Sequence, residues 1–347
     1  MNQLGAVTGR HAFDIGRLTS HLEQHLPDFR GPLDVQQFQG GQSNPTYLLT
    51  AGAAKYVMRS KPGAVAKLLP SAHAIEREFH VMRALASQGI PVPWTLLLVE
   101  DESVIGRAFY VMQHVEGRIF WEQSLPELGA SDRAQIYDEM NRVLAQLHRV
   151  DIERAGLSDY GKSGNYFQRQ IGRWSKQYRA SETGTIEAMD RLIDWLPQNI
   201  PPGDETTVVH GDYRMDNLIF HPTEPRIIAI LDWELSTLGH PLADFSYHCM
   251  SWHIPPGTFR GIAGLDYAAL GIPSEAEYMR RYCERTGRAG IEHWDFFLAY
   301  NLFRIAAILQ GVYKRATEGI ASSNNALKSG ENARVLAALG WQHAERA

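Results

Sequence analysis

The apolar positions of the first 115 residues predict one helix followed by a small antiparallel sheet. Residues 14–26 repeat apolar side chains at helical spacing, at Ile15, Leu18, Leu22 and Leu26. Short apolar runs between turn residues then predict strands at 33–38, 46–51 and 55–60. Strands that follow one another so closely pair as an antiparallel meander.

A second helix and two more strands complete this region. Residues 71–89 form a helical pattern that ends at a glycine, with one apolar face made of Ile75, Phe79, Met82 and Leu85. Two further strands are predicted at 94–100 and 108–115. One sheet with its helices makes a small α+β lobe over residues 1–115.

Beyond this point the periodicity is mainly helical, which predicts a second and larger lobe over residues 116–347. Helices are expected at 133–151, 165–181, 186–197, 274–287 and 292–319. Strand-like runs interrupt them only between residues 207 and 233. The 347 residues also exceed the size at which a single hydrophobic core stops growing, so two lobes are expected.

The composition is that of an ordinary globular protein and argues against several classes of function. It is 44% hydrophobic and 21% charged, and 34 basic against 39 acidic side chains give a net charge of -5. The charges are interspersed, so neither a nucleic-acid groove nor a polybasic membrane patch is indicated. Cys249 and Cys283 lack the spacing of a zinc site and cannot form a disulfide framework. Because no signal-peptide pattern and no apolar run of about 18 residues is present, a cytoplasmic protein without membrane insertion is expected.

A dense polar segment, His210–Asn217 (HGDYRMDN), lies between two apolar strand patterns. Val208 and Val209 end the first strand, and residues 218–220 begin the next. Both ends of this charged loop are therefore expected to be held by strands.

The next apolar run, 226–231, ends in two carboxylates, Asp232 and Glu234, which point to the same side if the chain is still extended. Asp212, Asn217 and Asp232 offer the hard oxygen ligands that Mg²⁺ prefers, and one carboxylate remains to accept a proton from an attacking hydroxyl. This set suits phosphoryl transfer, in which metal ions neutralise phosphate oxygens and a base orients the nucleophile. Asp and Asn also cap their own backbone in ordinary turns, so the residue types alone leave both interpretations open.

The order of these residues resembles a known family. His-x-Asp-x4-Asn has the spacing of the protein-kinase catalytic loop, and a metal-binding Asp after the next strand pair is the other recurring part. The chain resembles the aminoglycoside phosphotransferase and choline kinase-like family over nearly all of its 347 residues. It is most similar to the branch found as stand-alone bacterial phosphotransferases and as a kinase-like domain fused to acyl-CoA dehydrogenase-like proteins, through residues 68–85, 239–252 and 302–316. The resemblance implies a bilobal, protein kinase-like α+β fold with a small antiparallel-sheet N-terminal lobe and a larger, mainly helical C-terminal lobe.

The same resemblance implies roles for the polar residues. Asp212 would be the catalytic base, and His210 would brace the loop. Asn217 and Asp232 would be Mg²⁺ ligands, and Glu234 would help to hold a second metal ion.

The resemblance also implies ATP binding by the first lobe, where residues 38–49 (FQGGQSNPTYLL) would cover the phosphates. The residues that would contact ATP there are Gly40, Gly41, Ser43 and Asn44. Two glycines before a polar run also predict an ordinary hairpin turn. The backbone groups near Gln113 and Val115 would hydrogen-bond adenine.

Arg59 stands where protein kinases have the strand lysine that holds the nucleotide phosphates. Arginine keeps the charge but changes the geometry, so Arg59 would grip phosphate oxygens through its planar fork. Lys61, two residues along the same strand face, is the alternative. The helix partner of Arg59 is expected to be Glu78, with Glu76 as the competing candidate.

Two further positions match the family, Asp244 and His148. Asp244 would brace the catalytic loop through hydrogen bonds, although a carboxylate at a helix N-terminus is also common in its own right. His148 stands alone on an apolar face, where a hydrogen-bonded core histidine is the ordinary interpretation.

The acceptor site is expected in the branch-specific segments of the second lobe. The candidate residues are Arg169, Trp252, Arg304 and Tyr313, with Trp174, Gln310 and Arg315 as further members of the same segments. Aromatic and basic side chains suit an apolar acceptor with an anionic group, and they are also ordinary packing residues. An aminoglycoside is polycationic and would require an acidic pocket.

Three functions follow as hypotheses. The first is a kinase that uses ATP and Mg²⁺ to phosphorylate a hydroxyl, which the branch resemblance suggests belongs to a hydroxyacyl-CoA or a hydroxy acid. The second is a nucleotide-binding pseudokinase with a regulatory role, motivated by Arg59 at the lysine position. The third is a kinase whose acceptor is an aminoglycoside or an amino sugar.

Overall fold

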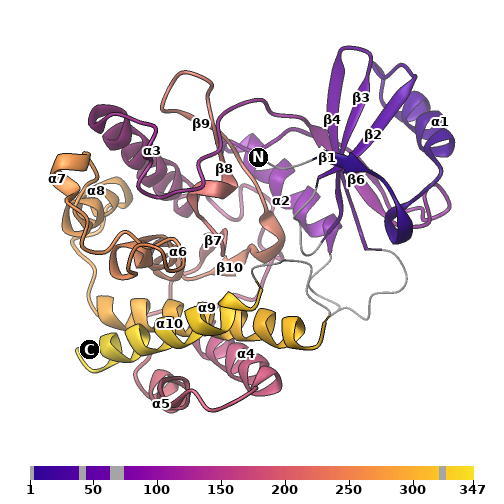
Figure 1. Cartoon of the computed structure of the whole chain (residues 1–347). Helices are drawn as coiled ribbons and strands as arrows, with labels where there is room; N and C mark the ends of the chain where they lie inside the picture. Colours follow the sequence, from indigo (N-terminus) through magenta and orange to yellow (C-terminus); the bar gives the residue numbers. More distant parts are fainter. Residues whose placement is uncertain (1–3, 39–43, 63–73, 320–325) are drawn as a thin grey trace. The chain divides into compact units, whose positions relative to one another are not determined.

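The structure, a computed structural model, describes residues 4–38, 44–62, 74–319 and 326–347 (Figure 1). The chain divides into two compact units. The N-terminal unit comprises Met1–Gly117 and Ile228–Leu235, and the C-terminal unit comprises Arg118–Ile227 and Ser236–Ala347. The sequence pattern places a single boundary near residue 116, whereas in the structure the short segment Ile228–Leu235 groups with the N-terminal unit.

Among its described residues, the N-terminal unit is built on an antiparallel sheet of six strands (Figure 1). The strands are β1 (Leu4–Ala6), β2 (Leu33–Phe38), β3 (Thr46–Ala51), β4 (Ala54–Ser60), β5 (Thr95–Val99) and β6 (Phe109–Gln113), in the order β1-β2-β3-β4-β6-β5. Ala51 pairs with Ala54 across a two-residue turn, where Gly52 adopts a φ of +61°, a conformation that favours glycine. The predicted meander of β2, β3 and β4 is therefore present, and β1 adds one edge strand.

Helices α1 (Ile15–His25) and α2 (Ile75–Ser87) cover opposite faces of this sheet. Met58 and Val111 pack with Leu18 of α1 in the hydrophobic core. Their strand neighbours Arg59 and Tyr110, which pair with each other, contact α2 instead. Because successive side chains of a strand alternate between the two faces, this register places one arginine on the face that α2 covers.

The segment Ile228–Leu235 contains most of β9 (Ile227–Ile230) and a 3-10 turn at Trp233–Leu235. The N–H of Ile230 donates to the carbonyl of Pro91 (2.8 Å), and the buried indole of Trp233 donates to the carbonyl of Ile230 (3.0 Å). These bonds fix the segment in the N-terminal unit, next to α2.

The C-terminal unit is mainly helical. Its helices are α3 (Ala130–His148), α4 (Tyr166–Ser181), α5 (Glu187–Trp195), α6 (Pro241–Cys249), α7 (Tyr267–Leu270), α8 (Glu275–Thr286), α9 (Trp294–Thr317) and α10 (Lys328–Ala344). Its strands include the antiparallel pair β7 (Thr207–Val209) and β10 (Thr237–Gly239), and β8 (Leu218–Phe220). All five helices predicted for this unit are present, whereas α6, α7 and α10 lie outside the predicted ranges.

Helix α9 is the central helix of this unit, and α4, α6 and α10 pack against it (Figure 1). By length and composition alone an 18-residue part of α9 could cross a membrane, with a mean hydropathy of 1.3, but 78% of that part is buried. Its apolar sequence is therefore explained by its place at the centre of the unit, where most of the helix packs against protein.

Gly239 allows β10 to lie between β7 and α4. A Cβ atom at this position would lie 2.6 Å from the ring of Tyr166 and 2.8 Å from Val209. Only glycine fits where the backbone lies this close to its neighbours. Gly239 therefore allows the pairing of β7 with β10, and the polar loop His210–Asn217 begins directly after β7.

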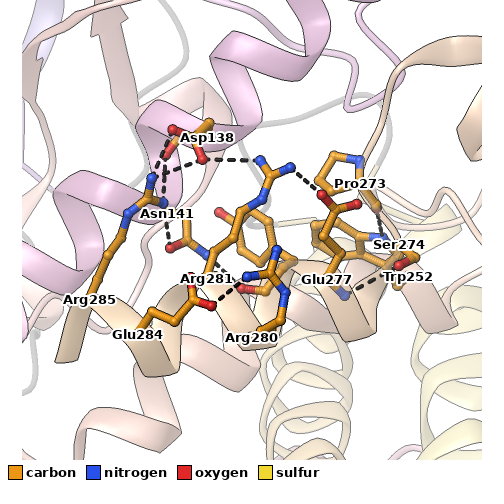
Figure 2. Close-up of polar contacts among 11 residues, drawn as sticks. Asp138, Asn141, Trp252, Pro273, Ser274, Glu277, Arg280, Arg281, Glu284 and Arg285 are labelled. Atoms are coloured by element: carbon orange, nitrogen blue, oxygen red, sulfur yellow. Dashed lines mark hydrogen bonds and ion pairs between the residues drawn. The ribbon is translucent and has the colours of Figure 1, made fainter. Parts of the chain in front are cut away.

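Helices α3 and α8 are joined by ion pairs with aromatic residues packed beside them (Figure 2). Asp138 of α3 accepts hydrogen bonds from Arg281 (3.0 Å) and Arg285 (2.8 and 2.9 Å) of α8. The indole of Trp252 is buried and donates to the carbonyl of Pro273 (3.0 Å) (Figure 2).

His248 packs against Trp252 and Tyr278, and its burial there predicts a loss of stability in acid. It is 5% exposed, its Nε2 lies 2.8 Å from the Tyr278 hydroxyl, and burial lowers its pKa to about 4. In the unfolded chain the pKa returns to about 6.5, so the unfolded state binds this proton first as the pH falls. We expect His248 to cost about 3 kcal/mol of stability between pH 6.5 and 4, visible as a falling urea midpoint. A His248→Gln variant should lose that part of the pH dependence, and an unchanged slope in the variant would contradict the assignment.

Candidate functional site

Arg59 is the centre of a charge cluster in the N-terminal unit. Its Nε lies 3.2 Å from Oε2 of Glu78, and its Nη2 donates to Oδ1 of Asp232 (3.0 Å) and Oε2 of Glu234 (2.9 Å). The arginine comes from β4, Glu78 from α2 and the other two carboxylates from the segment Ile228–Leu235. The pair Arg59 and Glu78 and the pair Asp232 and Glu234, which the sequence indicated separately, thus lie in one cluster.

The centre of the cluster, Arg59 with Glu78, is buried. The Glu78 side chain is 3% exposed, and it also accepts hydrogen bonds from the Asn44 amide (3.0 Å) and the Tyr110 hydroxyl (3.1 Å). Burial raises the pKa of Glu78, even though Arg59 and these hydrogen bonds favour the ionised carboxylate. Among the described residues, the guanidinium of Arg59 thus contacts the carboxyl groups of Glu78, Asp232 and Glu234.

Asp232 is not in extended backbone. Its φ of +66° lies in the left-handed region, and the next residues form the 3-10 turn Trp233–Leu235. The expectation that Asp232 and Glu234 share one side of a continuing strand is therefore wrong, and the turn brings both carboxylates to Arg59. Their side chains are 32% and 19% exposed, which makes them the members of the cluster that a ligand can reach.

Lys61 forms an ion pair of its own with Glu76. Both side chains are more exposed than those of Arg59 and Glu78, at 36% for Lys61 and 23% for Glu76. The sequence left open which basic residue pairs with which glutamate, and in the structure they form two separate pairs.

In the C-terminal unit, Asp244 of α6 holds the start of the polar loop. The backbone N–H groups of His210 (2.7 Å) and Gly211 (2.8 Å) donate to its two carboxylate oxygens, and Nε2 of His148 lies 3.3 Å from its Oδ2. Burial alone would raise the pKa of Asp244, but the hydrogen bond from His148 and the contacts with His210 outweigh it and lower the pKa. Asp244 is therefore an ionised, buried acceptor for the loop rather than only a helix-terminal carboxylate.

The side chains of His210 and Asn217 both hold Asp212. Nδ1 of the buried His210 accepts the N–H of Asp212 (3.1 Å). Asn217 lies in the 3-10 turn Met215–Asn217 and donates through Nδ2 to Oδ2 (3.0 Å) and to the backbone carbonyl (2.9 Å) of Asp212. Because the amide nitrogen is turned towards Asp212, the amide oxygen of Asn217 points the other way.

Two side chains around Asp212 were not predicted from the sequence. Nε of Arg214 lies 3.1 Å from Oδ2 of Asp212, and the hydroxyl of Tyr247 donates to Oδ1. Arg214 belongs to the loop itself, and Tyr247 follows Asp244 by three residues on α6, which is about one helical turn. That spacing is the one sequence signal that could have indicated Tyr247.

Three arginines surround the carboxylates of the loop. Besides its contact with Asp212, Arg214 lies 3.5 Å from Asp216, and Arg260 donates to Asp216 (2.7 Å). Arg304, expected as an acceptor residue, donates to the carbonyl of Gly211 (2.5 Å). The ionised Asp244 binds the N–H of the same Gly211, so arginine side chains and carboxylates both surround the loop.

The residues expected to contact ATP are only partly described. Gly40, Gly41 and Ser43 lie outside the described residues. Asn44 is described, and its Nδ2 donates to Glu78, so this donor serves the charge cluster.

The adenine prediction needs a correction at Gln113. The N–H of Gln113 donates to the carbonyl of Trp94 (2.8 Å), so that N–H is not available to adenine. Val115 is half-buried and lies two residues beyond the end of β6.

Most of the expected acceptor residues do not reach the loop in the described structure. Trp252 is 6% exposed with its indole N–H used, so it is a core residue and not an acceptor contact. Arg169 donates to a backbone carbonyl (2.6 Å), and the ring of Tyr313 packs on Gly330 of α10, where a Cβ would lie 2.8 Å away. Arg304 is the member of this group that contacts the loop.

The chain is similar in sequence to a known protein family and to several known proteins. The profile of the phosphotransferase enzyme family matches residues 34–293. Acyl-CoA dehydrogenase family member 10 of Mus musculus is 49% identical over 318 residues, which cover 91% of this chain and 30% of that protein. Acyl-CoA dehydrogenase family member 11 of Rattus norvegicus is 44% identical over 348 residues, covering 98% of this chain and 44% of that protein. The chain thus spans less than half the length of these relatives.

Solved structures are similar over almost the whole chain. A proposed aminoglycoside phosphotransferase of Ralstonia eutropha JMP134 has a TM-score of 0.89 and 58% identity, covering 97% of this chain and 99% of that one. The aminoglycoside phosphotransferase APH(4)-Ia, in a ternary complex with ADP and hygromycin B, has a TM-score of 0.60 and 15% identity, covering 93% of this chain and 97% of that one. At that identity the second likeness concerns the fold alone.

Proposed function

The chain belongs to the phosphotransferase enzyme family, and on that basis we propose that it moves the terminal phosphoryl group of ATP to a hydroxyl group of a small molecule. The observation that carries the proposal is the environment of Asp212. Its carboxylate is fixed by Asn217, Arg214 and Tyr247, on a loop whose start is bound by Asp244. A carboxylate held in this way is positioned to orient one incoming hydroxyl.

Asp212 would act on the acceptor and not on the nucleotide. A general base must lie within hydrogen-bond reach of the proton that it removes, and positioning supplies much of the rate in phosphoryl transfer. The acceptor oxygen forms a bond to phosphorus, the bond from that phosphorus to ADP breaks, and the acceptor proton passes to Asp212.

The described oxygen donors suit Mg²⁺. Asn217 turns its amide oxygen away from Asp212, while the N-terminal unit offers the partly exposed carboxylates of Asp232 and Glu234. Carboxylate oxygens are also the ligands that a hard divalent cation prefers. We propose Asn217 and Asp232 as ligands, with Glu234 for a second ion. When bound, Mg²⁺ neutralises charge on the phosphate oxygens.

The acceptor proposed is an anionic hydroxy compound, either a hydroxy acid or a hydroxyacyl-CoA. The guanidinium groups of Arg214, Arg260 and Arg304 around the loop support it, because guanidinium groups bind carboxylates and phosphates through charge-assisted hydrogen bonds. The two relatives named as acyl-CoA dehydrogenase family members point to the same chemistry. An aminoglycoside acceptor is the second candidate, favoured by the name of the 58% identical Ralstonia protein.

A coupled ADP-release assay with Mg-ATP tests the proposal. The acceptor panel holds hydroxyacyl-CoAs, free hydroxy acids, choline-like alcohols and aminoglycosides, and an Asp212→Asn variant serves as the blank. We expect acceptor-dependent ADP with the anionic hydroxy compounds. Turnover with aminoglycosides alone would support the second candidate, whereas ATP binding without turnover on any acceptor would support a pseudokinase.

A further inference from the structure

Helix α6 presents two side chains to the polar loop, one helical turn apart. Asp244 accepts the N–H groups of His210 and Gly211, and Tyr247 donates its hydroxyl hydrogen to Asp212. The first contact fixes the backbone of the loop. The second is made directly to the carboxylate for which we propose catalysis, so it bears on the reaction itself.

The two oxygens of Asp212 have different partners. Oδ2 accepts from the amide of Asn217 (3.0 Å) and lies 3.1 Å from Nε of Arg214. Oδ1 accepts from the hydroxyl of Tyr247. With Oδ2 engaged by two donors, Oδ1 is the oxygen to which an acceptor hydroxyl would bind, and a tyrosine hydroxyl is bound to it already.

The Tyr247 side chain is held from several sides. It is 3% exposed, and the guanidinium of Arg304 lies 5.1 Å from its ring centroid and 5.6 Å from that of Trp174. Arg304 in turn donates to the carbonyl of Gly211. Burial and the nearby charge of Asp212 raise the pKa of Tyr247, so the hydroxyl keeps its proton and is a constant donor.

We propose that the Tyr247 hydroxyl occupies the place of the acceptor hydroxyl on Asp212 until an acceptor displaces it. This inference rests on the proposed function and names a positioning residue for it. While Tyr247 is bound, it takes one of the two hydrogen bonds that Oδ1 of Asp212 can accept and lowers the basicity of that oxygen, so water is activated less as a substitute acceptor. An acceptor also binds through the rest of its molecule, so its hydroxyl can displace the tyrosine, whereas water cannot. Tyr247 therefore favours the acceptor over water.

The reaction that Tyr247 suppresses is ATP hydrolysis. A water oxygen would form a bond to the terminal phosphorus, the bond from that phosphorus to ADP would break, and the water proton would pass to Asp212 and then to solvent. Removing the tyrosine hydroxyl opens Oδ1 to water, whereas a purely structural role for the tyrosine would only lower turnover.

The test is ATP hydrolysis by the full chain with Mg-ATP and without an acceptor, in the wild type and in Tyr247→Phe. We expect the variant to release phosphate about five to ten times faster, the factor that one hydrogen bond commonly represents. The double variant Tyr247→Phe with Asp212→Asn should return to the blank rate. Tyr137→Phe is the matched control, because it removes a buried tyrosine hydroxyl that donates to the Gln123 carbonyl (2.7 Å) and does not contact Asp212.

Each outcome separates this proposal from the proposed function. Equal or slower hydrolysis in Tyr247→Phe, with Mg-ATP binding shown by calorimetry, overturns the role of Tyr247 and leaves the acceptor assay to decide the function. The same holds if both proteins bind Mg-ATP and neither hydrolyses it, because the hydroxyl is then not what protects ATP from water. Absence of Mg-ATP binding in the wild type removes the proposed function and this inference together.

Discussion

Replacing Asp212 with asparagine is expected to lower acceptor-dependent ADP release by about 10³-fold. Asparagine cannot take the acceptor proton. Its amide also places N–H donors where the carboxylate now accepts from Asn217, Arg214 and Tyr247. The loss should appear in kcat, while the affinity for Mg-ATP should stay within a few-fold, because the residue acts on the acceptor.

A matched surface carboxylate separates this effect from a general loss of charge. Asp190 of α5 forms an ion pair with Arg179 (2.5 Å), and its side chain is 35% exposed. Asp190→Asn should therefore retain full activity. If Asp212→Asn kept more than a tenth of the wild-type turnover, Asp212 would not be the base and the mechanism proposed for the loop would fail.

The elements with a clear periodicity could be predicted from the sequence alone. Strands β2, β3 and β4 and the central helix α9 have regular patterns, and they lie where the patterns place them. The family and its bilobal α+β fold are likewise confirmed. These features depend on local periodicity or on a sequence motif. Neither requires knowledge of contacts between distant parts of the chain.

Helix α10 shows where local reasoning fails. It contains Gly330 and Gly340, and glycine disfavours helix formation. In the structure both glycines lie against neighbours, since a Cβ would meet the ring of Tyr313 at 2.8 Å in one case and Leu302 at 3.2 Å in the other. Tertiary packing against α9 thus stabilises a helix that its own residues do not indicate.

Candidate site residues could be named from the sequence, but their contacts could not. Asp212, Asn217 and Asp232 could be named from their spacing. The left-handed backbone of Asp232 and the hydrogen bond of Tyr247 to Asp212 depend on chain segments that meet only on folding. The spacing of Tyr247 from Asp244 could have indicated the tyrosine, but it does not show which carboxylate the hydroxyl reaches, and no pattern marks the turn at Asp232, which is why the shared-strand argument was wrong.

Replacing Asp244 with alanine is expected to destabilise the C-terminal unit by about 3–5 kcal/mol, the range observed when one partner of a buried charge pair is removed. The carboxylate is 2% exposed and accepts from the N–H groups of His210 and Gly211, with His148 at 3.3 Å. Alanine leaves these donors buried without an acceptor. Turnover in the folded fraction should fall about 10²-fold, because the loop that carries Asp212 loses its anchor.

Asp151→Ala is the matched control for that result. Asp151 also accepts two backbone N–H groups, from Glu153 (3.1 Å) and Arg154 (3.0 Å), but at an exposed turn where water can replace it. Its loss should cost about 1 kcal/mol. The two variants would be compared by urea unfolding at pH 7, followed through tryptophan fluorescence, and by turnover under folding conditions. If both variants lose the same free energy of unfolding, Asp244 is an ordinary capping residue. If only Asp244→Ala loses several kcal/mol, and its turnover falls by more than its unfolded fraction explains, Asp244 is the residue that holds Asp212 in position.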